Sequence, residues 1–285
     1  MSQSASFPTR TSVLRVVLET LLSFARAPVR STAVFLIGLL CLLTACQRLS
    51  SPTTTQPELT VAAAADLQPA FEEIGREFQA LTKVKVTFSF GSSGTLTRQI
   101  ENGAPVDLFA AANTDYVDQL GKEGYIIPDT RAIYARGHIT LWTLKDSPIK
   151  IEKISDLTKS EVKRIAIANP EYAPYGMAAR ESLVKAGIWD TVKPKIVYGE
   201  NIRQTLQYAE TGNVEVAIVA LSLSTRSDGK WVLVPAELHK PIDQALAVVK
   251  STKDEKNARA LASFITGAQG RQILQRYGFA FADQP

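Results

Sequence analysis

Apolar and polar residues follow two alternating periods from residue 58 to residue 280. Val84–Phe90 has apolar side chains at every second position, which is typical of a strand. Leu67–Leu81 has them at helical spacing, and the two kinds of run then follow one another along the chain. Strands are predicted at Leu59–Ala63, Val84–Phe90, Asp107–Ala111, Ile139–Thr143, Arg164–Ala168, Lys195–Tyr198, Val214–Val219, Trp231–Val234 and Ala245–Val249.

Helical periodicity marks the segments between these strands. Several of the helical runs stop at a glycine, as at Gly103, Gly124 and Gly187, which is a common C-terminal signal. Alternation of strands and helices predicts an α/β fold with parallel sheets covered on both faces. Helices are predicted at Leu67–Leu81, Thr95–Asn102, Tyr116–Glu123, Ile154–Thr158, Gly176–Ala186, Ile202–Glu210, Glu255–Phe264 and Ala268–Tyr277.

The first 57 residues have a different pattern. An arginine-containing stretch precedes the apolar run Ala33–Leu43, and Leu43-Thr-Ala-Cys46 then resembles a bacterial lipobox. We therefore predict a lipoprotein signal peptide over residues 1–45, lipid on Cys46, and a Pro/Thr-rich flexible tether over residues 46–57. These features predict a periplasmic or other extracytoplasmic protein that is anchored to a membrane by lipid. The alternative is an uncleaved transmembrane anchor, although the apolar run is short for one.

Charge and cysteine content exclude several classes of function. The net charge of +4 comes mostly from the leader, which holds four of the 32 basic and one of the 28 acidic residues. The rest is nearly neutral, so nucleic-acid binding is not predicted. Without Cys41 and Cys46 there is no thiol for a metal site, a nucleophile or a disulfide. We predict no bound metal cation and no cofactor, and interpret Asp107 as a carboxylate that caps a neighbouring helix.

Four strand-to-helix junctions have the same chemical character. Each places the N-terminus of a helix at the carboxyl end of a strand, where α/β proteins bind ligands. Helix N-termini offer unpaired N–H groups and a positive dipole end, which suit an anion. An isolated Ser93 is more often a simple helix cap, so a single junction is weak support. The junctions are Ala64-Ala-Asp66, Gly91-Ser-Ser-Gly-Thr95, Ala173-Pro-Tyr-Gly176 and Gly199-Glu-Asn-Ile202.

The sequence around three of these junctions resembles that of a known family. The runs that carry this resemblance are Leu59–Leu67, Phe90–Leu96, Arg98–Ile100, Gly103–Phe109, Asn169–Gly176, Trp189-Asp190 and Arg276–Phe279. In this order and spacing they resemble the periplasmic molybdate-binding proteins. The resemblance implies a type II periplasmic-binding-protein fold, in which two α/β lobes are joined by two crossing strands and hold the ligand in a cleft. The implied lobes are residues 58–136 with 241–285, and residues 137–240.

The same resemblance implies a function and a set of ligand contacts. The protein would capture molybdate or tungstate as a monomer, without catalysis, and deliver it to the permease of an ABC importer. Ser93 matches a serine that contacts the oxyanion through its side chain and backbone, and Ser92 can add a second hydroxyl. Tyr175 and Ile202 match positions that use only the backbone N–H.

Two positions depart from the family pattern. Asp66 stands where many members have a ligand serine, and Ala220 stands where some have a tyrosine hydroxyl. A carboxylate close to a dianion repels it, so we expect Asp66 to cap the helix with its side chain and offer only backbone donors to the ligand. The tyrosine hydroxyl is lost unless Tyr175, Ser222 or Ser224 replaces it.

Two other functions compete with this one. The protein could bind another oxyanion such as sulfate, phosphate or a phosphonate, and a carboxylate at Asp66 would suit a protonated oxyanion. A serine hydrolase based on Ser93 is the enzymatic alternative. It is disfavoured because Gly91-Ser-Ser-Gly94 is not the Gly-x-Ser-x-Gly motif and neither histidine has an evident acidic partner.

Overall fold

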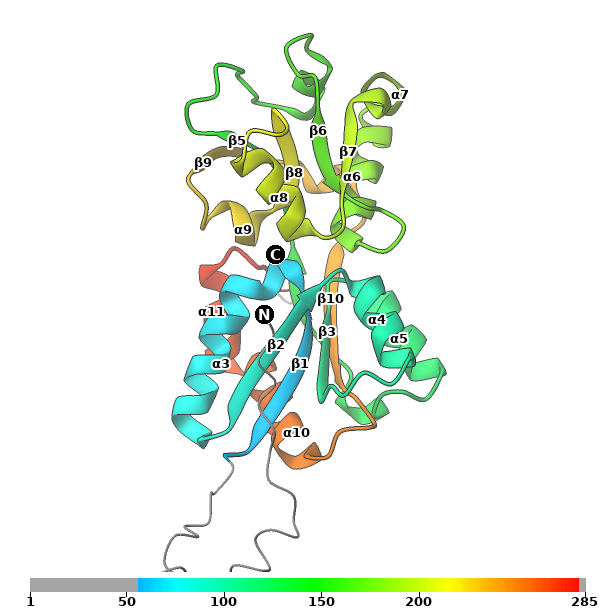
Figure 1. Cartoon of the computed structure of the whole chain (residues 1–285), viewed down its shortest axis with the longest axis vertical. Helices are drawn as coiled ribbons and strands as arrows, with labels where there is room; N and C mark the ends of the chain where they lie inside the picture. The colour runs from blue at the N-terminus through cyan, green and yellow to red at the C-terminus, as the bar shows by residue number, and fades with distance from the viewer. Residues whose placement is uncertain (1–55, 282–285) are drawn as a thin grey trace, which may run out of the picture. The chain divides into compact units, whose positions relative to one another are not determined.

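The strands of the protein form two separate sheets. The computed structural model describes residues 56–281, and each of its two sheets has five strands. The first sheet has the order β2-β1-β3-β10-β4, and the second has the order β7-β6-β8-β5-β9. Figure 1 shows each sheet with its own helices, the first below the second. We refer to these as the first and second lobes, and the predicted two-lobed α/β fold is confirmed.

The first lobe contains the start and the end of the described chain. Its strands are β1 (Glu58–Ala64), β2 (Lys85–Gly91), β3 (Leu108–Ala111), β4 (Ala132–Gly137) and β10 (Ile242–Val248). Its helical segments are η3 (Ala65–Leu67), α3 (Gln68–Thr82), α4 (Ser93–Glu101), α5 (Thr114–Lys122), η4 (Pro128–Thr130), α10 (Glu255–Thr266) and α11 (Ala268–Arg276). The apolar face of α3 is buried, and Gly75 lets this helix approach β2 closely, because a Cβ there would lie 2.7 Å from the ring of Phe88.

The second lobe is formed by the middle of the chain. Its strands are β5 (Ile139–Leu144), β6 (Ile165–Ala168), β7 (Ile196–Gly199), β8 (Val216–Ala220) and β9 (Gly229–Leu233). Its helical segments are η5 (Ile154–Thr158), α6 (Pro174–Lys185), α7 (Trp189–Val192), η6 (Lys193–Lys195), α8 (Ile202–Glu210), α9 (Leu221–Ser224) and η7 (Ala236–Leu238). Strands β6 and β8 are buried along their whole length, as expected for strands covered on both faces.

The prediction of purely parallel sheets was wrong. Strand β1 is parallel to β2 and β3, and β6 is parallel to β7 and β8, but β10 and β5 run antiparallel to their neighbours. The cause is the connection between the lobes. Ile139 at the start of β5 pairs with Ala220 at the end of β8, because the chain enters this sheet from the edge at which the parallel strands end. Strand β10 enters the first sheet in the same way, and its Ile242 pairs with Gly137 at the end of β4.

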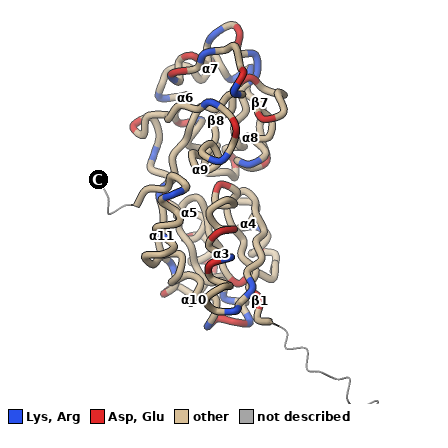
Figure 2. The backbone as a smooth tube through the Cα atoms, turned by 90° about the vertical axis from the view of Figure 1, so that its left-hand side faces the viewer, with Lys and Arg blue, Asp and Glu red and all other residues tan. Residues whose placement is uncertain are grey.

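The chain passes between the lobes in two places. The first lies between Gly137 and Ile139, and the second lies between Leu233 and Ile242. We retain the predicted boundaries at 136/137 and 240/241 as a proposal for where the lobes divide. Figure 2 shows positions of basic and acidic residues spread over both lobes, which agrees with the nearly neutral charge of the chain without its leader.

The predicted leader lies outside the described part of the chain. This applies to the signal peptide, to Cys46 and to all of the tether except residues 56 and 57. Within residues 56–281, none of the helices combines the length and the apolar character that crossing a membrane requires.

Candidate functional site

Four short backbone segments meet where the two lobes face each other. In the first lobe, Asp66 lies in η3 directly after β1, and Ser93 is the first residue of α4 after β2. In the second lobe, Tyr175 is the second residue of α6, and Ile202 is the first residue of α8 after β7. The first N–H groups of a helix have no acceptor within that helix. Each lobe therefore directs donors of this kind to the boundary.

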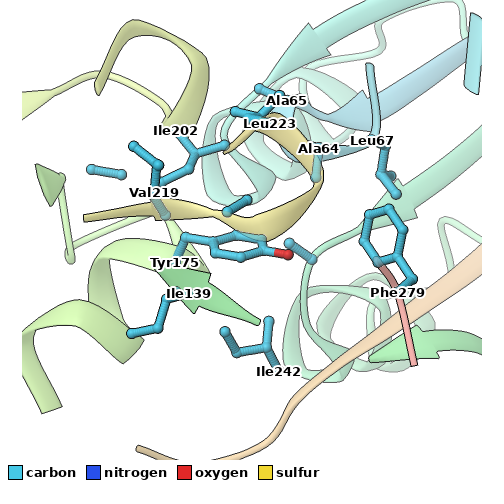
Figure 3. Packing of buried hydrophobic residues seen from close by; sticks show 14 of the residues in the cluster. Ala64, Ala65, Leu67, Ile139, Tyr175, Ile202, Val219, Leu223, Ile242 and Phe279 are labelled. Carbon is cyan, nitrogen blue, oxygen red and sulfur yellow. The ribbon is translucent and has the colours of Figure 1, made fainter. Parts of the chain in front are cut away.

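Contacts between the lobes bring these segments together. The N–H of Gly94 in α4 donates to the carbonyl of Tyr172 at 2.9 Å, and the Ser222 hydroxyl in α9 donates to the carbonyl of Asp66 at 2.8 Å. Helix α8, which begins at Ile202, contacts η3. Figure 3 shows Tyr175 and Ile202 among buried residues from both lobes. The predicted junctions are thus neighbours in space.

The candidate residues are almost completely enclosed. Asp66 and Ser93 are 0% exposed, Tyr175 is 2% exposed and Ile202 is 4% exposed. Two cavities nearby are lined by other residues: one of about 620 Å³ by residues of α6 and His239, and one of about 150 Å³ by Ala112, Pro174 and Ile242, among others. A ligand can therefore reach these four residues only when the lobes separate, which is how two-lobed proteins admit ligands.

The two serines after β2 have different partners. The Ser93 hydroxyl accepts the N–H of Ala112 at 2.9 Å, so its own proton remains for an acceptor such as a ligand oxygen. The Ser92 hydroxyl donates to Thr95 Oγ1 at 2.8 Å. Ser92, and not Ser93, occupies the N-cap position of α4, and its side chain makes no capping hydrogen bond. The simple helix-cap interpretation of Ser93 is therefore wrong.

Asp66 does not cap a helix. Neither η3 nor α3 has a side-chain cap, and Asp66 Oδ2 instead accepts a hydrogen bond of 2.7 Å from Gln244 Nε2 of β10. Its other oxygen, Oδ1, is buried and has no hydrogen-bond partner among the described residues. The predicted capping role was wrong: the carboxylate accepts its hydrogen bond from Gln244, which lies far away in the sequence but is adjacent in the fold.

Burial changes the acidity of Asp66. The loss of hydration raises the pKa of its carboxyl to about 6, although Gln244, the Tyr175 hydroxyl and the backbone N–H of Asp66 itself act to lower it. Burial likewise raises the pKa of the Tyr134 and Tyr175 hydroxyls well above their ordinary value. Both tyrosines are therefore neutral at physiological pH, whereas Asp66 can change its charge just below it.

Gln244 connects three other side chains at this boundary, those of Asp66, Tyr175 and Tyr134. Its Nε2 also donates to the Tyr175 hydroxyl at 3.1 Å, and its Oε1 accepts from the Tyr134 hydroxyl at 2.8 Å. Gly137 makes room for Tyr175, since a Cβ there would lie 2.1 Å from the tyrosine oxygen. Neither Gln244 nor Tyr134 was predicted from the sequence. The available signal was a glutamine directly before the apolar run Ala245–Val248 of β10.

The three hydroxyls considered as replacements for a tyrosine at position 220 are already hydrogen-bonded within the protein. Ser222 donates to the Asp66 carbonyl, and Ser224 Oγ lies 2.6 Å from Thr140 Oγ1. The Tyr175 hydroxyl belongs to the Gln244 cluster. Ala220 itself is 0% exposed at the end of β8.

Asp107 also differs from its predicted role. Its Oδ2 accepts the N–H of Thr60 at 2.7 Å, and its Oδ1 accepts the Thr252 hydroxyl at 2.6 Å. It therefore joins β1 to the turn after β10 and does not cap a helix. Within residues 56–281, histidine, cysteine and acidic side chains form no cluster that could hold a metal ion.

Comparison with known proteins agrees with this architecture. The family of bacterial extracellular solute-binding proteins matches residues 59–280, nearly all of the described chain. The chain belongs to this family. Molybdate-binding proteins of Azotobacter vinelandii and Rhodobacter capsulatus resemble this solute-binding protein at 36% identity over 228 residues and 34% over 224. Each alignment covers 78% of this chain, and 89% and 88% of the respective relative.

A solved structure shows the same fold. The periplasmic molybdate-binding protein of Azotobacter vinelandii matches with a TM-score of 0.75 and 28% identity, covering 79% of this chain and 100% of the other. The predicted resemblance to periplasmic molybdate-binding proteins and the predicted type II fold are therefore confirmed.

Proposed function

We propose that this solute-binding protein captures molybdate or tungstate outside the cytoplasm and presents it to the permease of an ABC importer. One observation carries the proposal. Four strand-to-helix junctions, two from each lobe, lie at the boundary between the lobes, and their residues Asp66, Ser93, Tyr175 and Ile202 are buried there. The proposed contacts are the N–H groups of Asp66, Ser93, Tyr175 and Ile202 with the Ser93 hydroxyl, and Ser92 lies beside them.

The chemistry of these donors suits a fully ionised oxyanion. N–H groups at helix N-termini and a serine hydroxyl donate hydrogen bonds, and they do so without a formal positive charge. Molybdate and tungstate carry two charges and four acceptor oxygens in nearly the same volume, so the site treats them alike. The relatives named as molybdate-binding proteins support this choice of ligand. Binding by dipoles alone also needs no bound cation or cofactor and no catalytic residue.

A protonated oxyanion such as hydrogen phosphate is the second candidate. The observation that favours it is Oδ1 of Asp66, a buried acceptor without a partner. A ligand that carries its own proton could donate to this oxygen, whereas an oxyanion without a proton would only be repelled by an ionised carboxylate. Sulfate is fully ionised, so discrimination against it would rest on size.

Calorimetric titration with a panel of oxyanions tests the proposal. We expect the purified protein to bind molybdate and tungstate much more tightly than sulfate, phosphate or chromate. Equal or tighter binding of phosphate would favour the second candidate. Failure to bind any oxyanion in the panel would reject the proposed function altogether.

We also propose that lipid on Cys46 holds the protein at a membrane surface and that it works there as a monomer. The lipobox Leu43-Thr-Ala-Cys46 and the polar sequence after it support this anchor. In cell fractionation, Cys46→Ser should release the protein from membranes or leave its signal peptide uncleaved. Normal cleavage together with unchanged membrane association of the variant would contradict the lipid anchor.

A further inference from the structure

A buried polar cluster at the lobe boundary includes a carboxyl that the proposed ligand contacts do not use. It consists of Asp66, Tyr134, Gln244 and Tyr175, all of them at most 3% exposed. Three of these come from the first lobe and Tyr175 comes from the second. The hydrogen bond from Gln244 to Tyr175 therefore joins the lobes beside the candidate site.

The hydrogen bonds within this cluster fix the direction of most of its protons. Both protons of the Gln244 amide are committed, one to Asp66 Oδ2 and one to the Tyr175 oxygen, and its carbonyl accepts from Tyr134. Asp66 Oδ1 remains without a partner in the described chain, although it is buried. Gln244 and the Tyr175 hydroxyl stabilise the Asp66 anion only in part, because Oδ1 has no partner and polar groups in protein interiors are normally hydrogen-bonded.

The backbone of Asp66 connects this carboxyl to the ligand. The N–H of Asp66 interacts with its own carboxylate, and the same N–H is one of the proposed ligand donors. Covalent geometry keeps an aspartate carboxylate within roughly 5 Å of its own amide nitrogen. A dianion bound to that N–H would thus meet a nearby negative charge in a region shielded from water, where charges interact strongly.

We propose that this protein takes up one proton on the Asp66 carboxyl when it binds its oxyanion. The proton leaves the buffer and forms an O–H bond at the carboxylate, and no bond in the oxyanion breaks. The neutral carboxyl no longer competes for its own N–H and no longer repels the dianion. The proposal rests on the proposed function, and it gives the aspartate at this position a role that a ligand serine would not have.

Few other groups can perturb this titration. Tyr134 and Tyr175 are the ionisable residues coupled to Asp66, and burial raises the pKa of both well above their ordinary value. The groups that shift the pKa of Asp66 include no charged residue. The charged residues on the elements that pack around Asp66 are Glu58, Glu72, Glu73, Arg76, Glu77, Arg136, Arg180, Glu181, Lys185, Arg203, Glu210 and Asp243.

Proton uptake is measured directly by titrating molybdate into the protein at pH 7.5 in two buffers with different heats of ionisation. We expect close to one proton per molybdate, and by linkage an affinity that falls about tenfold per pH unit above neutrality. At pH 5, where Asp66 is already mostly protonated, the uptake should nearly disappear. Tight molybdate binding without proton uptake at pH 7.5 would overturn this proposal and leave the proposed function intact, whereas no binding of any oxyanion would reject the proposed function itself.

Two variants show whether Asp66 is the group that takes up the proton. Asp66→Asn keeps the shape of the side chain but cannot ionise, so it should bind molybdate without proton uptake and with little pH dependence. Gln244→Leu removes a donor that lowers the pKa of Asp66, so the pKa of this carboxyl in the ligand-free protein should rise. As the pH is lowered, proton uptake should therefore begin to decline at a higher pH than in the wild type. Unchanged proton uptake in a folded Asp66→Asn protein would overturn the assignment. If that variant does not fold, an unchanged pH profile in Gln244→Leu would do so.

Discussion

The two lobes contribute unequally to the candidate site. The first lobe places the Ser93 hydroxyl and the Asp66 carboxyl at this boundary, whereas the proposed contacts of the second lobe are the backbone N–H groups of Tyr175 and Ile202. The Tyr175 hydroxyl accepts a hydrogen bond from Gln244 of the first lobe. We therefore propose that the choice among oxyanions is made in the first lobe, while the second lobe closes the site with contacts that most residue types can provide.

The largest expected effect concerns the carboxyl in the first lobe. Burial raises the pKa of Asp66 from 3.8 to about 6, so in the absence of ligand the folded state retains a proton that the unfolded state loses between about pH 4 and pH 6. Stability from this group is complete below pH 4 and is lost as the pH rises through 6. The free energy of unfolding of Asp66→Asn, measured against that of the wild type by denaturation, should therefore rise by about 3 kcal/mol from pH 3 to pH 7.

The control for this comparison is a carboxyl on the outside of the same lobe. Asp129 forms an ion pair with Arg259, and this contact lowers its pKa. Its stabilising contribution has the opposite pH dependence, since it is present at neutral pH and lost on acidification. Asp129→Asn should thus not gain stability toward pH 7. A gain equal to that of Asp66→Asn would contradict the assignment of the effect to burial.

The next largest effect distinguishes the two serines of the first lobe. If the free proton of Ser93 binds a dianion, Ser93→Ala should weaken molybdate binding by ~1.5–3 kcal/mol, the range for hydrogen bonds to charged groups. Ser92→Ala should cost less because its proton is bonded to Thr95. Calorimetric titration of both variants measures the difference. Unchanged affinity in Ser93→Ala, with stability lowered by about 1 kcal/mol, would give this residue a purely structural role.

The smallest effect is expected in the second lobe. Ile202 is buried, so Ile202→Val should lower the free energy of unfolding by about 0.5–1.5 kcal/mol. Molybdate affinity should remain unchanged, because the proposed contact is the backbone N–H. A loss of affinity as large as that of Ser93→Ala would contradict the unequal division between the lobes.

Local sequence patterns predicted most of the fold. Helix α8 has the bounds expected from its periodicity, Ile202–Glu210, and the strands lie within a few residues of their predicted positions. Strand β4 and the short helix α9 were not predicted, and neither was the antiparallel direction of β5 and β10. Those features depend on how the chain passes from one lobe to the other. The periodicity of a short segment carries no information about that connection.

The candidate site was predictable only in part, for the same reason. Its backbone donors follow from the strand-to-helix junctions and from the family resemblance. The state of Asp66 depends on Gln244, which is 178 positions away in the sequence. A helix cap was the expected role because it needs only neighbouring residues, but the fold provided a buried amide donor and removed water, which together determine where the carboxyl lies and how it titrates.

The central claim is that a fully ionised oxyanion binds between the lobes and that the negative charge of the Asp66 carboxylate opposes this binding until the carboxyl is protonated. The most direct measurement is titration of wild type and Asp66→Ser with molybdate and with phosphate, each at two pH values. We predict tight binding of molybdate by the wild type and equal or tighter binding by Asp66→Ser, because the substitution removes a nearby negative charge and adds a hydroxyl donor. A wild-type preference for phosphate that is lost in Asp66→Ser would contradict the account.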